Sequence, residues 1–166
     1  MPEKISEPKL PGGLSRLAFR LPIWFYRFHL GWILGTRFVL LRHTGRKSGL
    51  ARQNVLEVIR YDKQTGACII ASGWGMRSDW VKNIGANPEI TFQVRQKSMA
   101  GIAERLSPET GAAELQDYAR RHPAAMKELA GFMGYRLDGS EADIGELGKI
   151  LPMFILRPVN DDLPQQ

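Results

Sequence analysis

Short connections between apolar segments constrain the fold of this chain more than any other sequence feature. Residues 38–42 and 53–61 are apolar and partly β-branched, and a third apolar segment, 67–72, follows the turn-like sequence 62–66. A loop of about five residues can close a hairpin, but it cannot carry the chain across a sheet to a parallel neighbour. We therefore expect these three segments to form antiparallel strands.

Three further segments extend this pattern toward the C-terminus. Residues 89–94 alternate between apolar and polar side chains, as a half-buried strand does, and residues 99–106 follow as its hairpin partner. Residues 150–158 form an apolar closing strand with Pro152 near its start, where an edge position tolerates proline. Six short strands joined mostly as hairpins predict an α+β, mainly β fold: a small antiparallel barrel with peripheral helices.

Helix signals occur between the strands. Ser78 and Asp79 are good N-cap residues, and Ser107 followed by Pro108 is a typical helix start. A His-Pro sequence at 122–123 breaks that second helix before another begins. The sequence thus predicts helices over 80–85, 107–121 and 124–134, and a Gly-rich, acidic loop over 136–148.

Residues 14–36 form an apolar stretch that is rich in aromatic side chains. A bilayer span needs about 20 mostly apolar residues, and Pro22, Arg27 and His29 interrupt this stretch near its middle. We therefore expect an amphipathic helix. Its aromatic side either packs on the domain core, contacts a membrane surface or covers a bound substrate. The aromatic residues concerned are Trp24, Phe25, Phe28 and Trp32.

A chain of 166 residues fits one domain that folds without a disulfide or a metal. Residues 1–13 mix charges with prolines and lack a secretory signal, so we expect a flexible N-terminus, one domain over 14–158 and a tail over 159–166. Cys68 is the one cysteine and lies in an apolar run, where it is expected to be buried. These features favour a cytoplasmic location, with peripheral membrane contact through the aromatic helix as an alternative.

The basic stretch 41–55 is the clearest candidate for a binding site. It has no acidic residue, and the net charge of +6 and sequence pI of about 9.7 favour anionic partners for the whole chain. Gly45 and Gly49 bracket a turn in which positive φ angles let successive backbone N–H groups converge on an anion such as phosphate. A solvated basic turn is the alternative. The cations are Arg42, Arg46, Lys47 and Arg52.

Other kinds of site find little support in the sequence. The three histidines are far apart and there is no cysteine pair, so we expect no metal site. No local nucleophile signature is present. We also expect no nucleic-acid partner, because Phe92 is the only aromatic residue between Tyr61 and Tyr118 besides two tryptophans.

A set of short motifs, in a fixed order, carries a resemblance to a known family. The motifs are Thr-Gly-Arg-Lys-Ser-Gly at 44–49, Arg52, Ala-Ser-Gly-Trp-Gly at 71–75, Ser-Asp-Trp at 78–80, Asn83 and Ala-Asn-Pro at 86–88. Together they resemble the deazaflavin-dependent nitroreductase family over residues 38–106, and more loosely over the aromatic helix and the closing strand. The resemblance implies a split β-barrel related to flavin-binding oxidoreductases.

The resemblance also implies a cofactor and the residues that hold it. Arg46, Lys47, Ser48 and Arg52 would bind the phosphate and acidic tail of coenzyme F-420, an 8-hydroxy-5-deazaflavin. The residues that would surround its ring and linker are Asn54, Val55, Ala71, Ser72, Gly73, Trp74, Ser78, Asp79, Trp80 and Asn83. The chain departs from the nitro-reducing members, whose C-terminal tyrosines line the substrate pocket, because only Tyr118 and Tyr135 are available here after Tyr61.

The implied activity is transfer of a hydride from reduced coenzyme F-420 to a small apolar acceptor: an activated alkene, a quinone-like molecule or a nitro compound. One alternative is a lipid or tetrapyrrole binding protein on the same fold, and another is FMN in place of F-420. Both a monomer and a homodimer fit the sequence. Asp79 opens a helix that favours its ionised form, so we expect Ser72, Ser78 or a backbone N–H to polarise the acceptor and Tyr118 or water to return the proton.

Overall fold

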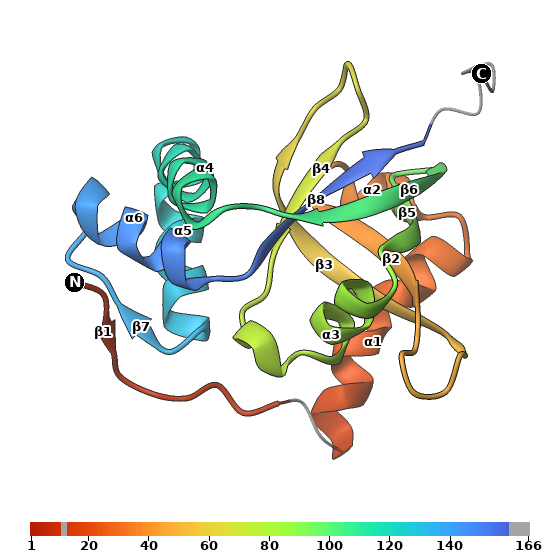
Figure 1. Cartoon of the computed structure of the whole chain (residues 1–166), viewed down its shortest axis with the longest axis horizontal. Helices are drawn as coiled ribbons and strands as arrows, with labels where there is room; N and C mark the ends of the chain where they lie inside the picture. The colour runs from red at the N-terminus through yellow and green to blue at the C-terminus, as the bar shows by residue number, and fades with distance from the viewer. Residues whose placement is uncertain (11–12, 160–166) are drawn as a thin grey trace.

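A closed antiparallel barrel forms the centre of the computed structural model, which describes residues 1–10 and 13–159 (Figure 1). The strands follow the order β2-β3-β4-β8-β6-β5, and β5 pairs with β2 to close the barrel. The predicted fold class is confirmed. The strand bounds are β2 Phe38–Thr44, β3 Ala51–Tyr61, β4 Cys68–Ala71, β5 Glu89–Val94, β6 Lys97–Arg105 and β8 Met153–Pro158.

Helices lie on two sides of the barrel. The helices α4, α5 and α6 gather beside it as a separate layer, whereas α1 runs along β2 and β3 (Figure 1). A short two-stranded sheet pairs β1 (Glu3–Lys4) with β7 (Tyr135–Arg136). The helix bounds are α1 Gly13–Arg27, α2 Gly31–Leu34, α3 Asp79–Ala86, α4 Pro108–Arg121, α5 Pro123–Phe132 and α6 Glu141–Ile150, and a 3-10 turn, η1, covers Gly75–Arg77.

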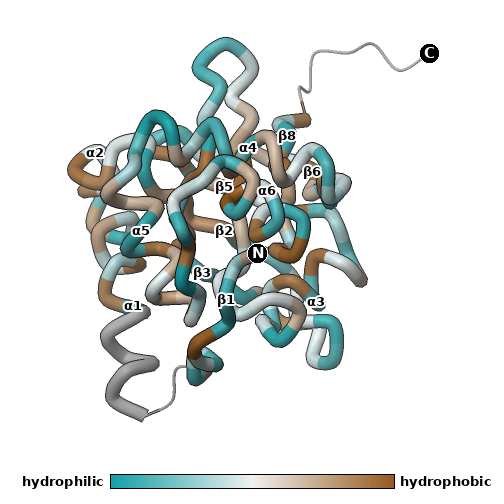
Figure 2. The backbone as a smooth tube through the Cα atoms, turned by 90° about the vertical axis from the view of Figure 1, so that its left-hand side faces the viewer, coloured by the Kyte–Doolittle hydropathy of each residue, from teal (hydrophilic) through white to brown (hydrophobic). Residues whose placement is uncertain are grey.

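Two hydrophobic cores share the barrel wall. Phe92 and Leu156 are fully buried inside the barrel, whereas Leu115 and Leu147 are fully buried between the wall and the helical layer. Side chains alternate across a strand, so the wall can supply both cores at once. Hydrophobic segments of the chain include parts of the barrel strands and α2, whereas the β3–β4 hairpin that projects at the top is hydrophilic (Figure 2).

The prediction of a loop over 136–148 was wrong, because α6 occupies most of it. Ser140 caps this helix by accepting a hydrogen bond from the Asp143 N–H at 3.1 Å. Gly148 lies against α4 so closely that an added Cβ would be 2.7 Å from the Cα of Ala112. Gly148, one of the glycines that suggested a loop, instead allows the backbones of α4 and α6 to approach each other.

The N-terminal aromatic stretch forms two helices rather than one. The break falls at 28–30, where His29 adopts a positive φ of 59°. Ile23 and Tyr26 of α1 are buried against Leu40 of β2, and the Tyr26 hydroxyl donates to the Phe38 carbonyl at 3.0 Å. The four aromatic residues singled out from the sequence are instead exposed: Trp24, Phe25, Phe28 and Trp32. Within the described residues, no helix is long and apolar enough to cross a membrane.

Pro152 does not lie on an edge strand. It immediately precedes β8, which pairs with β4 on one side and β6 on the other. Its carbonyl accepts a hydrogen bond from the Ser72 N–H at 3.0 Å. Proline is tolerated here because the ladder of β8 begins only at Met153.

Gly101 of β6 provides a test of how tightly the barrel wall is packed. A Cβ at this position would lie 2.5 Å from the Arg157 carbonyl oxygen and 2.7 Å from a ring carbon of Phe92. We expect Gly101→Ala to lower the free energy of unfolding by about 1–3 kcal/mol, since a packed wall cannot move aside without strain. Urea denaturation measures the change. As a control, Gly85→Ala in α3 has open space around the new methyl group and should leave stability equal or higher.

Candidate active site

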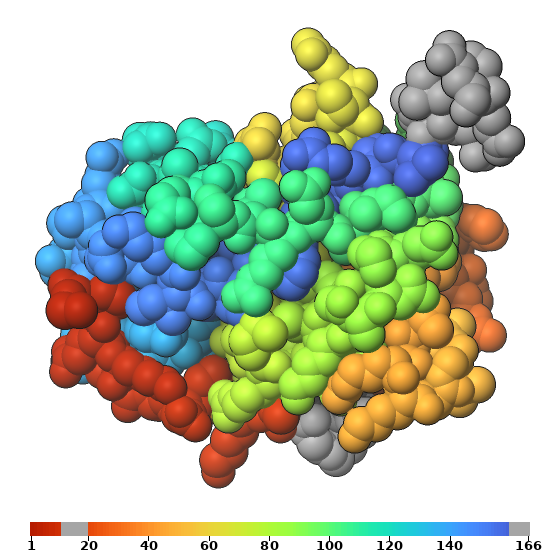
Figure 3. All heavy atoms as spheres, in the orientation of Figure 1, coloured from red at the N-terminus to blue at the C-terminus, as the bar shows by residue number. Residues whose placement is uncertain are grey.

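The loop between β2 and β3 forms a closed turn with basic side chains. Its backbone is closed by hydrogen bonds from Gly49 N to Gly45 O and from Gly45 N to Leu50 O, each 2.8 Å, and Gly49 has a φ of 68°. Within the described residues, the N–H groups of Lys47 and Ser48 make no hydrogen bond, and the side chains of Lys47 and Arg52 form no ion pair. The loop lies against α3 at one corner of the molecule (orange against green, Figure 3).

Asn83 of α3 holds this loop in place. Its Oδ1 accepts hydrogen bonds from the backbone N–H of Arg46 at 3.1 Å and from Arg46 Nη1 at 2.9 Å. Arg46 Nη1 also lies 3.2 Å from the carboxylate of Asp79. The fold therefore brings together three residues of the cofactor site that the resemblance implies, although the resemblance assigns Asn83 and Asp79 to the ring and its linker rather than to the loop.

His43 links the same network to the barrel. Because Asn83 Oδ1 accepts from Arg46, its Nδ2 must donate to His43 Nδ1, which lies 3.2 Å away. His43 is then neutral with its proton on Nε2, which donates to Asn54 Oδ1 at 2.9 Å. Burial is the main cause that lowers the pKa of His43, and the nearby Arg52 lowers it further. No local sequence pattern indicated that His43 links the loop to the barrel, since its partners Asn54 and Asn83 lie 11 and 40 residues away along the chain.

The two predicted catalytic serines bind each other. Ser72 Oγ donates to the Gly75 carbonyl at 2.8 Å, so the 2.8 Å contact between the two hydroxyls must have Ser78 as its donor. Both residues are buried. In this conformation neither serine has a hydroxyl hydrogen left for a bound acceptor. The pair instead closes the turn η1, and Ser78 precedes α3 without a side-chain capping bond.

The other predicted ring residues have different surroundings. Trp80 is buried in the barrel core, where its ring meets Phe154 edge to face at a centroid distance of 5.8 Å. Trp74 packs against Phe132 of α5, and its indole N–H donates to the Lys9 carbonyl at 3.0 Å. Val55 packs beside α1. Ala71 and Gly73 are partly exposed next to the serine turn.

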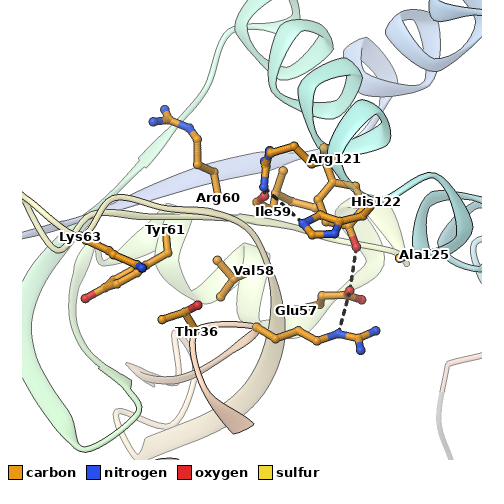
Figure 4. Close-up of a pocket in the computed structure, with 12 residues that line it drawn as sticks. Thr36, Glu57, Val58, Ile59, Arg60, Tyr61, Lys63, Arg121, His122 and Ala125 are labelled. Atoms are coloured by element: carbon orange, nitrogen blue, oxygen red, sulfur yellow. Dashed lines mark hydrogen bonds and ion pairs between the residues drawn. The ribbon is translucent and has the colours of Figure 1, made fainter.

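Tyr118 lines a cavity of about 390 Å³ beside β3, and neither serine lines this cavity. Figure 4 shows Glu57, His122 and Ala125 around the same cavity. The Tyr118 hydroxyl donates to Glu57 Oε1 at 2.8 Å. Burial, followed by this hydrogen bond, raises the pKa of Tyr118 above its ordinary range. Sequence reasoning missed Glu57, Arg37 and His122, which line the same cavity; a charged residue in the middle of an apolar strand was the one signal for Glu57.

A closed six-stranded barrel with a cationic, glycine-bracketed loop defines a split-barrel protein that can hold an anionic ligand. The chain belongs to the F-420H(2)-dependent quinone reductase family, whose model matches residues 19–139. It is therefore an F-420-dependent reductase, which confirms the resemblance to deazaflavin enzymes at this level. No curated protein matches the chain.

Solved structures share the fold at low sequence identity. One is described as an F-420-H2 dependent reductase, with 22% identity over 73% of this chain and 94% of that chain and a TM-score of 0.49. Another, described as a domain-swapped dimer, has 21% identity over 82% and 99% and a TM-score of 0.51. A protein of unknown function from Agrobacterium tumefaciens has 14% identity over 90% and 59% and a TM-score of 0.52.

The neutral His43 makes the stability of the fold depend on pH. Its folded-state pKa lies below the ordinary value of 6.5, so the unfolded chain takes up the proton first as the pH falls. The contribution of His43 to the free energy of unfolding is complete above about pH 6.5 and is lost as the pH falls from there through the folded-state pKa.

Urea denaturation at pH 7.5 and 5.5 measures this effect. We expect wild type to lose more stability on acidification than His43→Gln, which has no proton to bind. His122→Gln, an exposed histidine in the same chain, should behave as wild type. Equal losses in wild type and His43→Gln would contradict the neutral assignment.

Proposed function

We propose that this enzyme passes a hydride from reduced coenzyme F-420 to a small apolar acceptor of the quinone-like, activated-alkene or nitro class. The observation that supports it most directly is at the β2–β3 loop and the start of β3. There the side chains of Lys47 and Arg52 and the backbone N–H groups of Lys47 and Ser48 have no partner among the described residues. Such a loop suits a phosphate and carboxylate tail. The family match supplies the cofactor class.

The tail of the cofactor would be held by Arg46, Lys47, Ser48 and Arg52. Asn54, Val55 and the turn from Ala71 to Trp74 would contact the ring and its linker. Ser78, Asp79, Trp80 and Asn83 complete the set; Trp80 would act by packing under α3, because its ring is buried. When bound, the deazaflavin supplies the hydride, and solvent supplies the proton that completes a two-electron reduction.

The chain's own contribution is positioning. The Asn83 network fixes the loop on α3 before any ligand arrives, and the serine pair fixes the turn η1. The N-terminal segment strengthens that turn, since Arg77 Nη2 donates to the Pro8 carbonyl at 2.8 Å. Binding energy at the tail can then orient the ring without a dedicated acid beside it.

The cofactor assignment predicts a loss of affinity when the loop loses charge. A charge-assisted hydrogen bond contributes about 1.5–3 kcal/mol, so Lys47→Ala and Arg52→Ala should each weaken F-420 binding about tenfold or more. Stability should change little, because exposed charges contribute little to folding. Titration of the purified protein with F-420, followed by fluorescence, measures the affinity.

Lys127→Ala is the matched control, because this exposed lysine of α5 lies outside the loop. Parallel titrations with FMN and with a fluorescent fatty acid address the two alternatives. If the Lys47→Ala, Arg52→Ala double variant binds F-420 as tightly as wild type, the loop does not hold the tail.

The exposed aromatic residues of α1 and α2 suit contact with a membrane surface, where an apolar acceptor would be dissolved. Trp24 of α1 and Trp32 of α2 are 48% and 55% exposed, and the cationic residues Arg20 and Arg27 lie on α1. Tryptophan beside arginine is typical of segments that lie in the interface of a bilayer.

Vesicle flotation tests this contact. We expect wild type to bind vesicles that contain anionic phospholipid, and Trp24→Ala with Trp32→Ala to abolish most of that binding while F-420 affinity is unchanged. Ile150→Ala, an exposed apolar residue of α6, should bind as wild type. Unchanged flotation of the double variant would exclude this surface as the contact.

A further inference from the structure

His43 lies where the two parts of the proposed cofactor site meet. Its ring is bonded to Asn83 of α3 at 3.2 Å and to Asn54 of β3 at 2.9 Å. Asn83 holds the β2–β3 loop through Arg46, whereas Asn54 is one of the residues proposed to contact the ring and its linker. His43 and Asn83 are each only 5% exposed, so the bond between them is shielded from water. One buried imidazole therefore connects the tail side of the site with the ring side.

The hydrogen bonds around Asn83 admit only a neutral His43. Asn83 Oδ1 accepts from the Arg46 backbone N–H at 3.1 Å and from Arg46 Nη1 at 2.9 Å, so Asn83 Nδ2 donates to His43 Nδ1. A proton on His43 Nδ1 would set two donors against each other at 3.2 Å. Turning the Asn83 amide around would satisfy the histidine, but it would set the amide NH₂ group against two donors of Arg46. A charged His43 is thus incompatible with the contacts between Arg46 and Asn83.

Asn83 is the main polar support of the Arg46 side chain. Among the described residues, the other polar partner of this side chain is the carboxylate of Asp79, 3.2 Å from Nη1. That carboxylate is 78% exposed, so water screens its attraction for Arg46. The position of the loop on α3 therefore depends mainly on Asn83, and through Asn83 on the protonation of His43.

Charged groups on β3, α3 and the β2–β3 loop lie near His43. Burial is the main cause that lowers its pKa, and the hydrogen bond with Asn54 acts in the opposite direction. Arg52 of β3 lowers the pKa further, and Asp79 of α3 raises it. Arg46 of the loop is bonded to the same Asn83. A bound anion would favour the protonated ring by charge alone, so the charge effect and the hydrogen-bond effect of protonation have opposite signs.

We propose that His43 is a positioning residue for the anionic tail, and that coenzyme F-420 binds tightly only while this histidine is neutral. The inference rests on the proposed function, in which the β2–β3 loop holds the tail. Protonation of His43 takes from Arg46 the amide oxygen that fixes both its backbone and its guanidinium. The loop then no longer presents its N–H groups and cations in one arrangement, and affinity for the tail falls on acidification.

Titration of the full chain with F-420 at pH 7.5, 6.5 and 5.5 tests the inference. We expect the affinity of wild type to fall about tenfold over this range, as the loss of one hydrogen bond would cause. His43→Gln keeps an acceptor for Asn83 and a donor for Asn54 but binds no proton, so its affinity should not fall in this way. The matched control is His122→Gln, which removes an exposed histidine and should follow wild type.

The comparison with His43→Gln also removes any effect of protons that the cofactor itself binds, since both proteins meet the same ligand. Equal pH dependence in wild type and His43→Gln would overturn the inference. Tighter binding by wild type in acid would overturn it as well, because that result means that the charge of the histidine outweighs its hydrogen bonds.

Asn83→Asp tests whether the clash of donors at this position is the cause. A carboxylate accepts hydrogen bonds from Arg46 and from a protonated His43 at the same time. Its negative charge should weaken F-420 binding at every pH, but acidification should weaken it no further. If Asn83→Asp loses affinity in acid as wild type does, the clash at Asn83 is not the cause and the inference is wrong.

NMR of the free protein separates this inference from the proposed function. The imidazole nitrogen signals report the protonation of His43, and the backbone amide signal of Arg46 reports its hydrogen bond to Asn83. We expect both signals to change with the same midpoint in the absence of ligand. A His43 that stays neutral down to pH 5, or protonates without moving the Arg46 signal, would overturn the inference. If wild type fails to bind F-420 at any pH, the proposed function is wrong, whereas the two NMR signals still decide whether His43 positions the loop.

Discussion

The pairing of β8 with both β4 and β6 is the constraint on which the rest of the structure depends. This strand is separated from both partners by the helices α4, α5 and α6, yet it closes the barrel wall between them. Its side chains alternate: Phe154 and Leu156 fill the barrel, whereas Met153 and Ile155 enter the helical core. One strand therefore joins the two cores into a single cooperative unit, and the loops of the candidate site rest on that unit.

The positions of the loops follow from polar contacts rather than from the cores. Asn83 is buried and uses its amide oxygen for Arg46 and its amide nitrogen for His43. A buried amide must satisfy both groups, so α3 and the β2–β3 loop have one relative arrangement. Burying the pair of serines has the same effect on the turn η1.

Local patterns in the sequence identified most of the fold. Hairpin lengths and strand alternation were sufficient for the barrel, because both are properties of neighbouring residues. The 136–148 segment was misread because Gly145 and Gly148 lower helix propensity locally. A Cβ at either position would collide with α4, so the reason for these glycines is visible only in the packed structure. The basic loop could be found because its cations and glycines are neighbours in the sequence. The Tyr118–Glu57 contact, by contrast, spans 61 residues and left no local pattern.

The hydrogen bonds that fix the β2–β3 loop have a consequence for the thermodynamics of binding. They run in one direction, from Arg46 to Asn83 to His43 to Asn54, and each donor is polarised by the next bond. The backbone of the loop is thus immobilised during folding, and a ligand does not have to order it. The side chain of Lys47 is still free to rotate, and holding it costs about 0.5–1.5 kcal/mol of conformational entropy. Affinity at this site is therefore limited by the ordering of long side chains rather than by the ordering of the backbone.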